Sequence, residues 1–542
     1  MSPTHEVLNQ PPPYEGHNSF TADIALTEAV RREGAAWAEG ELTELGALAG
    51  SAAAIQWGFQ ANENPPVLHT HDRFGHRIDE VAYHPAYHEL MRTAVAFGLH
   101  AAPWADGRPG AHVARAAKMI VWSQVDAGHT CPISMTYSVV PALRQQPDLA
   151  AEWEPTLFSR TYDPAFAPAD RKQGAIFGMA MTEKQGGSDV RANTTTAEPT
   201  GTAGEYVLTG HKWFCSAPMS DAFLVLAQAP GGLSCFLLPR WRPDGTRNAM
   251  RIQRLKDKLG DRSNASSEVE YERAWARLVG EEGHGVRTII EMVNHTRLDC
   301  VLGATATHRH GLAQALHHTS HRQAFGRTLV DQPLMTNVLA DLAVESEAVT
   351  VAALRLARAY DADPQDEHER LLKRLATPVV KYWACKRAPV HAAESLECLG
   401  GNGFVEASGL PRIFRQSPLN GIWEGSGNVI CLDVLRAMGR SPESVDAYLT
   451  EVKAAAGADA RLDAAVSRIE KELADHDDIE ARARRVVEAM ALAFQGSLLV
   501  RHSDPAVADA FCASRLDGDA GKALGTLPPG VQARRIVDRA RG

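Results

Sequence analysis

At the stretch MTEKQGGSDV, from Met181 to Val190, the spacing of apolar residues along the chain changes. Upstream of it, segments such as AHVARAAKMIVWSQVDAG carry apolar residues three and four positions apart, which predicts helices. Downstream of it, short apolar runs such as AFLVLAQA are separated by Gly, Pro and Asp, which is typical of strands and turns. The adjacent Gly186 and Gly187 let a ligand approach the backbone closely, although a plain turn explains the same letters equally well.

The order of these helical and strand-like patterns predicts the domain organisation. We expect an N-terminal arm and helical domain over residues 1–175, and a middle β-domain over 176–285. A C-terminal four-helix bundle over 286–440 and an extra helical domain over 441–542 follow. Strands confined to the middle of the chain indicate an α+β protein built in layers rather than a doubly wound sheet.

Composition narrows the class of protein. The 542 residues are 44% apolar, which suits several buried cores, and the net charge of −10 disfavours a protein that coats DNA through bulk positive charge. Eight scattered cysteines without a C-x-x-C pair predict reduced thiols, and the start of the chain lacks a secretory signal, so we expect a cytoplasmic protein. No uncharged apolar run reaches 18 residues, so no membrane span is expected.

Histidine pairs raise the question of a metal site. His69 and His71 form H-T-H, and His317 and His321 lie one helical turn apart. Neither pair has the Glu of the H-E-x-x-H zinc motif, so we interpret both as structural or surface histidines and expect no metal. The chain also lacks G-x-G-x-x-G, G-K-[ST] and G-x-S-x-G, which disfavours a Rossmann site, a P-loop and a serine hydrolase.

Two further segments combine ring-binding and anion-binding features. Gly210–Ser216 places an aromatic and a hydroxyl at the end of a predicted strand, which suits a planar ligand ring, while a core aromatic is an equal alternative. Glu397–Phe404 ends a predicted helix with three glycines, whose backbone N–H groups suit an anion such as a pyrophosphate. A glycine-rich helix stop explains that segment as well.

The last unusual segment, Ile422–Asn428, contains a carboxylate between a tryptophan and a glycine. Partial desolvation beside the aromatic ring would raise the pKa of Glu424 towards that of a useful base. From the sequence alone, the simpler interpretation is that this carboxylate stabilises the N-terminus of the following helix.

In their order and spacing, these four segments resemble those of the flavin-dependent acyl-CoA dehydrogenases. Asp257–Ser263 is similar to the family's D-K-x-G-x-R-x-S strand, and Arg322–Gly326 to its R-x-x-F-G helix end. The resemblance runs from about residue 170 to 440. With its N-terminal arm and its extra C-terminal domain, the whole chain is similar to the branch of the family associated with DNA alkylation damage.

The resemblance implies FAD as the cofactor, with its ring between the middle domain and the helical bundle. The residues that it implies near FAD are Met181, Thr182, Gln185, Gly186, Gly187, Ser188, Val190, Phe214, Cys215, Ser216, Trp423, Ser426, Gly427 and Asn428. A second set resembles residues that bind FAD across a subunit contact, which implies a homotetramer: Arg322, Phe325, Gln332, Gly400 and Gly401.

The resemblance also implies the reaction. Glu424 stands at the family's usual base position and would remove the α-proton of an acyl-CoA, while Thr296 at the alternative position is not a carboxylate. Ser188, Arg297 and Gly425 are implied to contact the substrate. Asn294 and Glu397 replace the usual Asp and Gln, and the branch is associated with weak, isovaleryl-CoA-like dehydrogenase activity.

A role in the alkylation response implies binding and protection of double-stranded DNA. Residues 441–542 hold 14 Lys and Arg against 17 Asp and Glu, so any DNA contact must use local clusters. The candidates are Arg436, Arg534, Arg535 and Arg539, for which a solvated helix face is the alternative. The alternative function is a fully active FAD-dependent dehydrogenase of short or branched acyl-CoAs without a DNA role.

Overall fold

The computed structural model describes residues 4–542, and the chain forms two compact units that interleave along the sequence. Unit 1 comprises the residues up to Ala52, Pro109–Gln124 and Arg297–Gly542, and unit 2 comprises Ala53–Arg108 and Val125–Thr296. The chain therefore passes between the units four times.

Unit 2 is built on a seven-stranded sheet in the order β3-β6-β4-β5-β9-β7, with β8 paired to β9. A further pairing of β6 with β7 closes the ring β6-β4-β5-β9-β7, which makes the sheet a barrel. Its interior is filled by apolar side chains such as Leu208, Phe223 and Phe236. The strands are β3 (Phe177–Ala180), β4 (Thr196–Pro199), β5 (Glu205–Ser216), β6 (Ala222–Ala229), β7 (Gly232–Pro239), β8 (Met250–Leu255) and β9 (Ser266–Val279).

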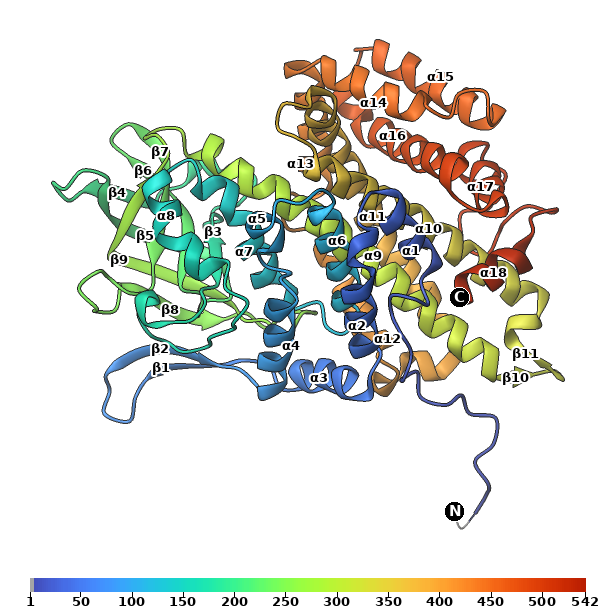
Figure 1. Cartoon of the computed structure of the whole chain (residues 1–542), viewed down its shortest axis with the longest axis horizontal. Helices are drawn as coiled ribbons and strands as arrows, with labels where there is room; N and C mark the ends of the chain where they lie inside the picture. The colour runs from blue at the N-terminus through green and yellow to red at the C-terminus, as the bar shows by residue number, and fades with distance from the viewer. Residues whose placement is uncertain (1–3) are drawn as a thin grey trace. The chain divides into compact units, whose positions relative to one another are not determined.

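Helices cover one side of these strands (Figure 1). Thr136 in α7 accepts a hydrogen bond at 2.9 Å from the backbone N–H of Phe177, which fastens α7 to β3. The helices of this unit are α3 (Ala52–Glu63), α4 (Pro85–Ala96), α5 (Ala102–Ala105), α7 (Thr130–Leu143) and α8 (Pro147–Leu157). A hairpin of β1 (Val67–His71) and β2 (Arg77–Ala82) interrupts the predicted helical region, because VLHTH and RIDEVA alternate around the turn DRFGH.

Unit 1 is helical. Its three longest helices are α9 (Gly285–His321), whose first turns belong to unit 2, α10 (Pro333–Asp361) and α11 (Glu367–Glu397). Proline opens α10, and the Asp366 side chain caps α11 by accepting from the N–H of Glu369. The shorter helices are α1 (Ile24–Arg32), α2 (Glu39–Ala49), α6 (Ala111–Ser123), α12 (Leu410–Gln416) and α13 (Gly427–Arg440).

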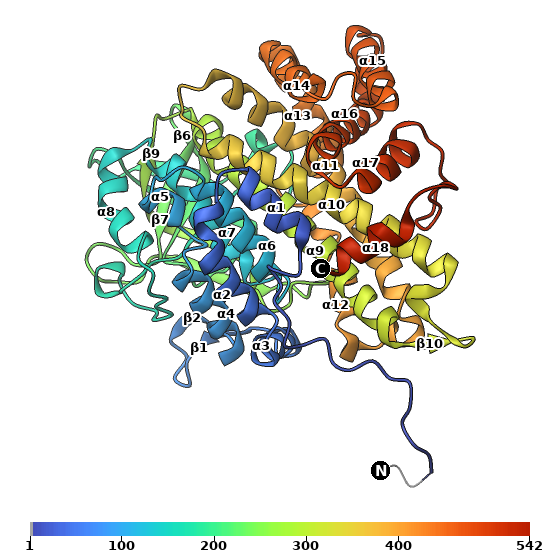
Figure 2. The ribbon, with the colours of Figure 1, turned by 45° about the vertical axis from the view of Figure 1, so that its right-hand side comes forward.

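The helices after residue 440 pack onto the same unit (Figure 2). Arg355 of α10 is buried and bonds to Glu451 of α14 at 2.6 Å, so the two regions share a charged contact inside the unit. The helices are α14 (Glu443–Lys453), α15 (Ala460–Ala474), α16 (Ile479–His502), α17 (Pro505–Phe511) and α18 (Ala533–Arg541). Among residues 4–542, no helix is long and apolar enough to cross a bilayer.

Candidate active site

In unit 2, the loop from Met181 to Val190 is anchored by a buried ion pair. The carboxylate of Glu183 lies 2.7 Å from the Nζ of Lys212, and both side chains are fully buried. Glu183 also accepts backbone N–H bonds from Thr194 and Thr195. Although burial opposes ionisation, these donors hold the pKa of Glu183 well below its usual range. The loop is therefore fixed at Glu183, while its tip from residue 184 to 189 stays exposed.

Thr182 connects this loop to the end of β5. Its carbonyl oxygen accepts a hydrogen bond at 2.8 Å from the N–H of Trp213. Its side chain covers Gly187 so closely that a Cβ there would collide with the Thr182 hydroxyl, which is why the position requires glycine. The predicted ring-binding residues Thr182 and Phe214 are thus joined through adjacent backbone.

The end of β5 presents an aromatic ring and a hydroxyl. Phe214 is 50% exposed, and Ser216 is half-buried with its Oγ 3.3 Å from that of Ser266. Cys215 faces the barrel core and is fully buried, so its thiol is turned away from any ligand at this surface. The exposed loop tip holds the predicted residues Gln185, Gly186, Gly187 and Ser188, and the predicted Met181 and Val190, at the ends of the loop, are half-buried.

In unit 1, two buried cations hold the loop that carries Glu424. The Nζ of Lys381 donates to the carbonyl oxygens of Trp423 and Gly425, at 2.9 and 2.8 Å. The Nε of Arg297 donates to the carbonyl oxygen of Glu424 at 3.1 Å. These bonds maintain a left-handed backbone at Glu424, whose φ is 58°, a conformation that costs of order 1–3 kcal/mol in a non-glycine residue.

The side chain of Arg297 is itself held by a carboxylate of α13. Its guanidinium lies 2.8 Å from the carboxylate of Asp433, which also pairs with Arg374 at 3.1 Å. Although burial opposes it, the two guanidinium groups hold the pKa of Asp433 below its ordinary value. The predicted substrate residue Arg297 therefore holds the backbone of Glu424 in place. Thr296, beside it, is buried and donates to the carbonyl oxygen of Val293 at 3.0 Å.

The N-terminus of α13 gathers positive charge. Ser426 is the cap residue and leaves the first helical N–H groups without a side-chain bond from itself. A Cβ at Gly427 would lie 3.0 Å from Lys386 Cε and 3.4 Å from the Arg484 guanidinium. Arg484 also donates to Asn428 Oδ1 at 2.8 Å. The predicted anion-binding residues of this segment thus lie beside two exposed cations whose place here the sequence did not predict.

The residues predicted to reach FAD across a subunit contact lie at the surface of unit 1. Phe325 is 99% exposed at the turn between β10 (Gln323–Ala324) and β11 (Arg327–Thr328). Arg322 donates to the carbonyl oxygen of Asn9 at 2.5 Å, and Gln332 to that of Ala324 at 3.0 Å. Gly400 and Gly401 are exposed in a short 3₁₀ helix.

The arginines predicted to contact DNA all have carboxylate partners. Arg534 pairs with Asp331 and Asp538, and Arg535 pairs with Asp504 at 2.8 Å. Arg539 pairs with Glu28 and Glu347, and Arg436 pairs with Asp433 at 3.3 Å. Helix α18 therefore carries arginine charge that is compensated within the chain.

The candidate histidines of α9 bond to the backbone, whereas His71 bonds to the hydroxyl of Thr70. His317 bonds through Nε2 to the carbonyl oxygen of Pro12 at 2.7 Å, and His321 through Nδ1 to that of His317 at 2.8 Å. Within residues 4–542, no group of three or more His, Cys, Asp or Glu side chains is arranged to hold a metal ion.

Three segments of the chain match known protein-family domains. Residues 9–164 match the Adaptive response protein AidB N-terminal domain. Residues 178–274 match the acyl-CoA dehydrogenase middle domain, and residues 283–439 the acyl-CoA dehydrogenase C-terminal domain.

Individual relatives agree along most of the chain. The putative acyl-CoA dehydrogenase AidB of Escherichia coli (strain K12) is 45% identical over 523 residues, which cover 96% of both proteins. Among solved structures, Caenorhabditis elegans ACDH-11 in complex with C11-CoA has a TM-score of 0.86 at 27% identity and covers 95% of this chain and 94% of that one. The apo-form of Bd2924 has a TM-score of 0.84 at 29% identity, covering 91% of this chain and 99% of that one.

A more distant structure, an acyl-CoA dehydrogenase of Bacillus anthracis complexed with FAD, shares the fold at 17% identity with a TM-score of 0.64, over 84% of this chain and 81% of that one. The predicted α+β fold, with its helical and middle β parts, is confirmed by these matches. The chain therefore belongs to the acyl-CoA dehydrogenase family of FAD-dependent oxidoreductases, and it is similar to AidB along its whole length.

Proposed function

We propose that this chain oxidises an acyl-CoA between its α and β carbons, with FAD as the cofactor and Glu424 as the base. The observation that carries the proposal is the loop at Glu424, where Lys381 and Arg297 bond to three successive carbonyl oxygens. A carboxylate held at a fixed position removes a weakly acidic α-proton more effectively than a mobile one.

The residues of each unit suit FAD. In unit 1, the N-terminus of α13 with Lys386 and Arg484 supplies N–H donors and two cations for phosphate groups. In unit 2, the half-exposed ring of Phe214 suits the face of the isoalloxazine, and the hydroxyls of Thr182 and Ser216 suit its polar edge. When bound, FAD supplies the acceptor for the hydride that leaves the β carbon.

An acyl thioester is the substrate class that the relatives favour, because ACDH-11 binds C11-CoA. Ser188 is exposed on the loop tip and Gly425 follows the base, so both are proposed substrate contacts. Arg297 serves by fixing the backbone of Glu424. We propose that turnover is weak and includes isovaleryl-CoA-like thioesters.

The experiment separates proton removal from oxidation. The purified flavoprotein is incubated with isovaleryl-CoA in D₂O, and deuterium at the α carbon is measured together with the flavin absorbance. Native protein should exchange the α-proton and bleach the flavin, and Glu424→Gln should lose both while it retains FAD. Exchange at the native rate in the Gln variant would overturn the assignment of the base.

We further propose that the protein binds double-stranded DNA in the cytoplasm as a homotetramer and protects it during the response to alkylation damage. The support is the similarity to AidB over 96% of the chain and the match to the AidB N-terminal domain. Because Arg534 and Arg535 have carboxylate partners, DNA phosphates must compete with Asp331 and Asp504 for them. The alternative is a dehydrogenase without this role.

Salt dependence separates these two possibilities. Duplex binding is measured against salt for native protein, for Arg534→Ala with Arg535→Ala, and for a control pair, Arg92→Ala with Arg273→Ala, whose arginines also pair with surface carboxylates. The DNA role predicts that the log–log slope flattens by about 1–2 in the first variant and not in the control. Absent or salt-insensitive binding would support the alternative.

A further inference from the structure

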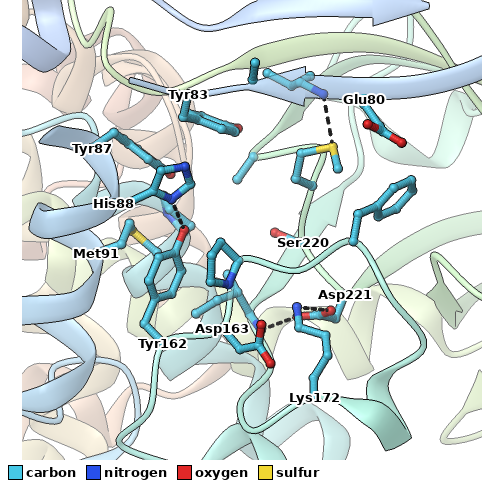
Figure 3. A pocket seen from close by; sticks show the side chains of 18 of the residues that line it. Glu80, Tyr83, Tyr87, His88, Met91, Tyr162, Asp163, Lys172, Ser220 and Asp221 are labelled. Atoms are coloured by element: carbon cyan, nitrogen blue, oxygen red, sulfur yellow. Dashed lines mark hydrogen bonds and ion pairs between the residues drawn. The ribbon is translucent and has the colours of Figure 1, made fainter. Parts of the chain in front are cut away.

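Unit 2 contains a cavity of about 430 Å³ that none of the segments assigned to FAD or the base lines. It lies where β2, α4 and the loops after α8 and β5 come together (Figure 3). Its volume falls in the range of small-molecule sites. The cavity therefore requires an explanation separate from the dehydrogenase chemistry.

Aromatic side chains form much of its wall. Tyr83 and Tyr87 stack with their ring centroids 4.3 Å apart, and Tyr162 hydrogen-bonds to His88 Nδ1 at 3.0 Å. Phe166 lines the cavity as well, and Met91 adds a flexible apolar surface. Rings held in this way favour a flat, largely apolar ligand, because aromatic groups pack face to face or edge to face.

The charged groups of the wall all have partners within the protein. The Lys172 ammonium lies 2.6 Å from the carboxylate of Asp221, and both side chains are buried. Glu80 pairs with Arg247 at 3.1 Å. Asp163 accepts backbone N–H bonds from residues 165 and 173, at 3.0 and 3.1 Å. A charged ligand would enter without a partner or would have to break one of these contacts.

Two histidines line the cavity, His69 and His88, and His88 adds no charge near neutral pH. Burial, with a smaller contribution from the Arg92 guanidinium, lowers the pKa of His88 below its ordinary value. Its ring is therefore neutral at pH 7, and the hydroxyl of Tyr162 occupies its Nδ1.

A fully buried hydroxyl in the wall lacks a partner. Ser220 lines the cavity and is 3% exposed, and within residues 4–542 its Oγ has no hydrogen bond. An unsatisfied buried hydroxyl costs about 1–3 kcal/mol, which a ligand group can recover by bonding to it. The hydroxyl of Ser220 can either donate to or accept from such a group, because its hydrogen rotates about the Cβ–Oγ bond.

We propose that this cavity binds an uncharged aromatic compound that carries one hydrogen-bonding group, and that Ser220 bonds to that group. The stacked tyrosines and Phe166 contact the ring system. This site is distinct from the proposed acyl-CoA site, since Ser188, Glu424 and Gly425 do not line the cavity.

Three compounds with one ring system test the proposal: neutral 2-naphthol, anionic 2-naphthoate and cationic 2-naphthylmethylammonium. Their binding to the native flavoprotein at pH 7 is measured by calorimetry, with and without saturating isovaleryl-CoA. We expect 2-naphthol to bind at least about tenfold more tightly than either ion, and isovaleryl-CoA to leave its affinity unchanged.

The serine is tested against a matched control. Ser220→Ala should weaken 2-naphthol binding about three- to tenfold, the value of one hydrogen bond. Ser138→Ala removes another fully buried hydroxyl that lacks a partner within residues 4–542 and does not line the cavity, and it should bind like native protein. Equal or tighter binding of an ion, competition by isovaleryl-CoA, or equal affinities in the two serine variants would each overturn the proposal. The comparison of the three compounds uses native protein, so it stands even if a variant fails to fold.

Discussion

The Nζ of Lys381 lies 2.8 Å from the carbonyl oxygen of Gly425, the residue that follows Glu424. Lys381 also bonds to the carbonyl oxygen before Glu424, so one buried ammonium spans the base position from both sides. The position of the carboxylate therefore depends on a lysine of α11 that stands more than forty residues earlier in the chain.

Replacing Lys381 by Met should remove both bonds while nearly keeping the side-chain length. We expect the free energy of unfolding to fall by about 1–3 kcal/mol, because two carbonyl oxygens lose a buried donor. We also expect α-proton exchange to slow at least about tenfold, with KM changed less than kcat, since the base is misplaced rather than the substrate. Lys373→Met, on the same helix and over the ring of Tyr360, is the control and should keep native exchange. Equal losses in the two variants would contradict a positioning role for Lys381.

Gly427 tests the anion site at the start of α13. In Gly427→Ala the new Cβ would press on Lys386 Cε at 3.0 Å and displace the ammonium. We expect FAD to bind about tenfold more weakly, as expected for one weakened charge-assisted bond, with an unchanged or higher melting temperature because alanine favours helix. Gly439→Ala lies on the same helix and its Cβ meets nothing within 4 Å, so this variant should retain FAD. Flavin fluorescence on dilution measures both, and full retention of FAD in Gly427→Ala would remove this site from the FAD proposal.

Phe325 tests the predicted tetramer. Its ring is 99% exposed, so Phe325→Ser should change the stability of a single chain by no more than about 0.5 kcal/mol. If this turn lies in a subunit contact, the variant should dissociate and release FAD, as measured by light scattering and flavin absorbance. Phe74→Ser, at the exposed tip of the β1–β2 hairpin, is the control and should leave the mass unchanged. A Phe325→Ser protein with native mass would place the contact elsewhere.

A pH experiment tests the contact between the bundle and the helices after residue 440. Although burial opposes it, Arg387 and Arg515 lower the pKa of Glu345 to about 2. Its folded pKa lies below the unfolded value of about 4.3, so its stabilising contribution is present above that value and is lost as the pH falls through about 2. Arg515→Met should raise that pKa and shift the acid unfolding midpoint to higher pH.

The same variant should cost about 3 kcal/mol at pH 7, because Asp341 and Glu345 lose a buried partner. Arg415→Met breaks an exposed pair with Glu406 and should cost less than about 1 kcal/mol, with no shift of the acid midpoint. Circular dichroism against denaturant and pH measures both. Identical acid midpoints in the two variants would refute the coupling of Glu345 to Arg515.

Sequence reasoning identified the family and the base loop because their signals are local. Glu424 and the glycines around it stand within seven residues, and helical spacing marks the bundle. It missed Lys381, because a single lysine in an apolar helical run is normally expected to lie at the edge of the hydrophobic core. It also did not connect Arg484 with Asn428, which lies 56 residues away along the chain and is reached only in the folded unit.

The arginines of α18 also show that sequence reasoning cannot identify partners that lie far away along the chain. The clustering of these arginines in sequence suggested an exposed basic face, but most of the carboxylates that neutralise them are remote: Glu28, Asp331, Glu347 and Asp504. Arg539 bonds to Glu28, which stands 511 residues earlier. A charge cluster in one helix therefore says little about surface potential until its distant partners are known.

The interleaving of the two units has a consequence for synthesis. Unit 2 is complete in sequence at Thr296, so it has all its parts while the rest of the chain is still on the ribosome. Helices α1 and α2 emerge first but belong to unit 1, and α1 contacts α18 through Glu28 and Arg539. Helix α1 can therefore complete its packing only when α10 and, at the end of synthesis, α18 have been made. We therefore expect nascent chains of this protein to depend on chaperones that bind the exposed N-terminal segment during translation.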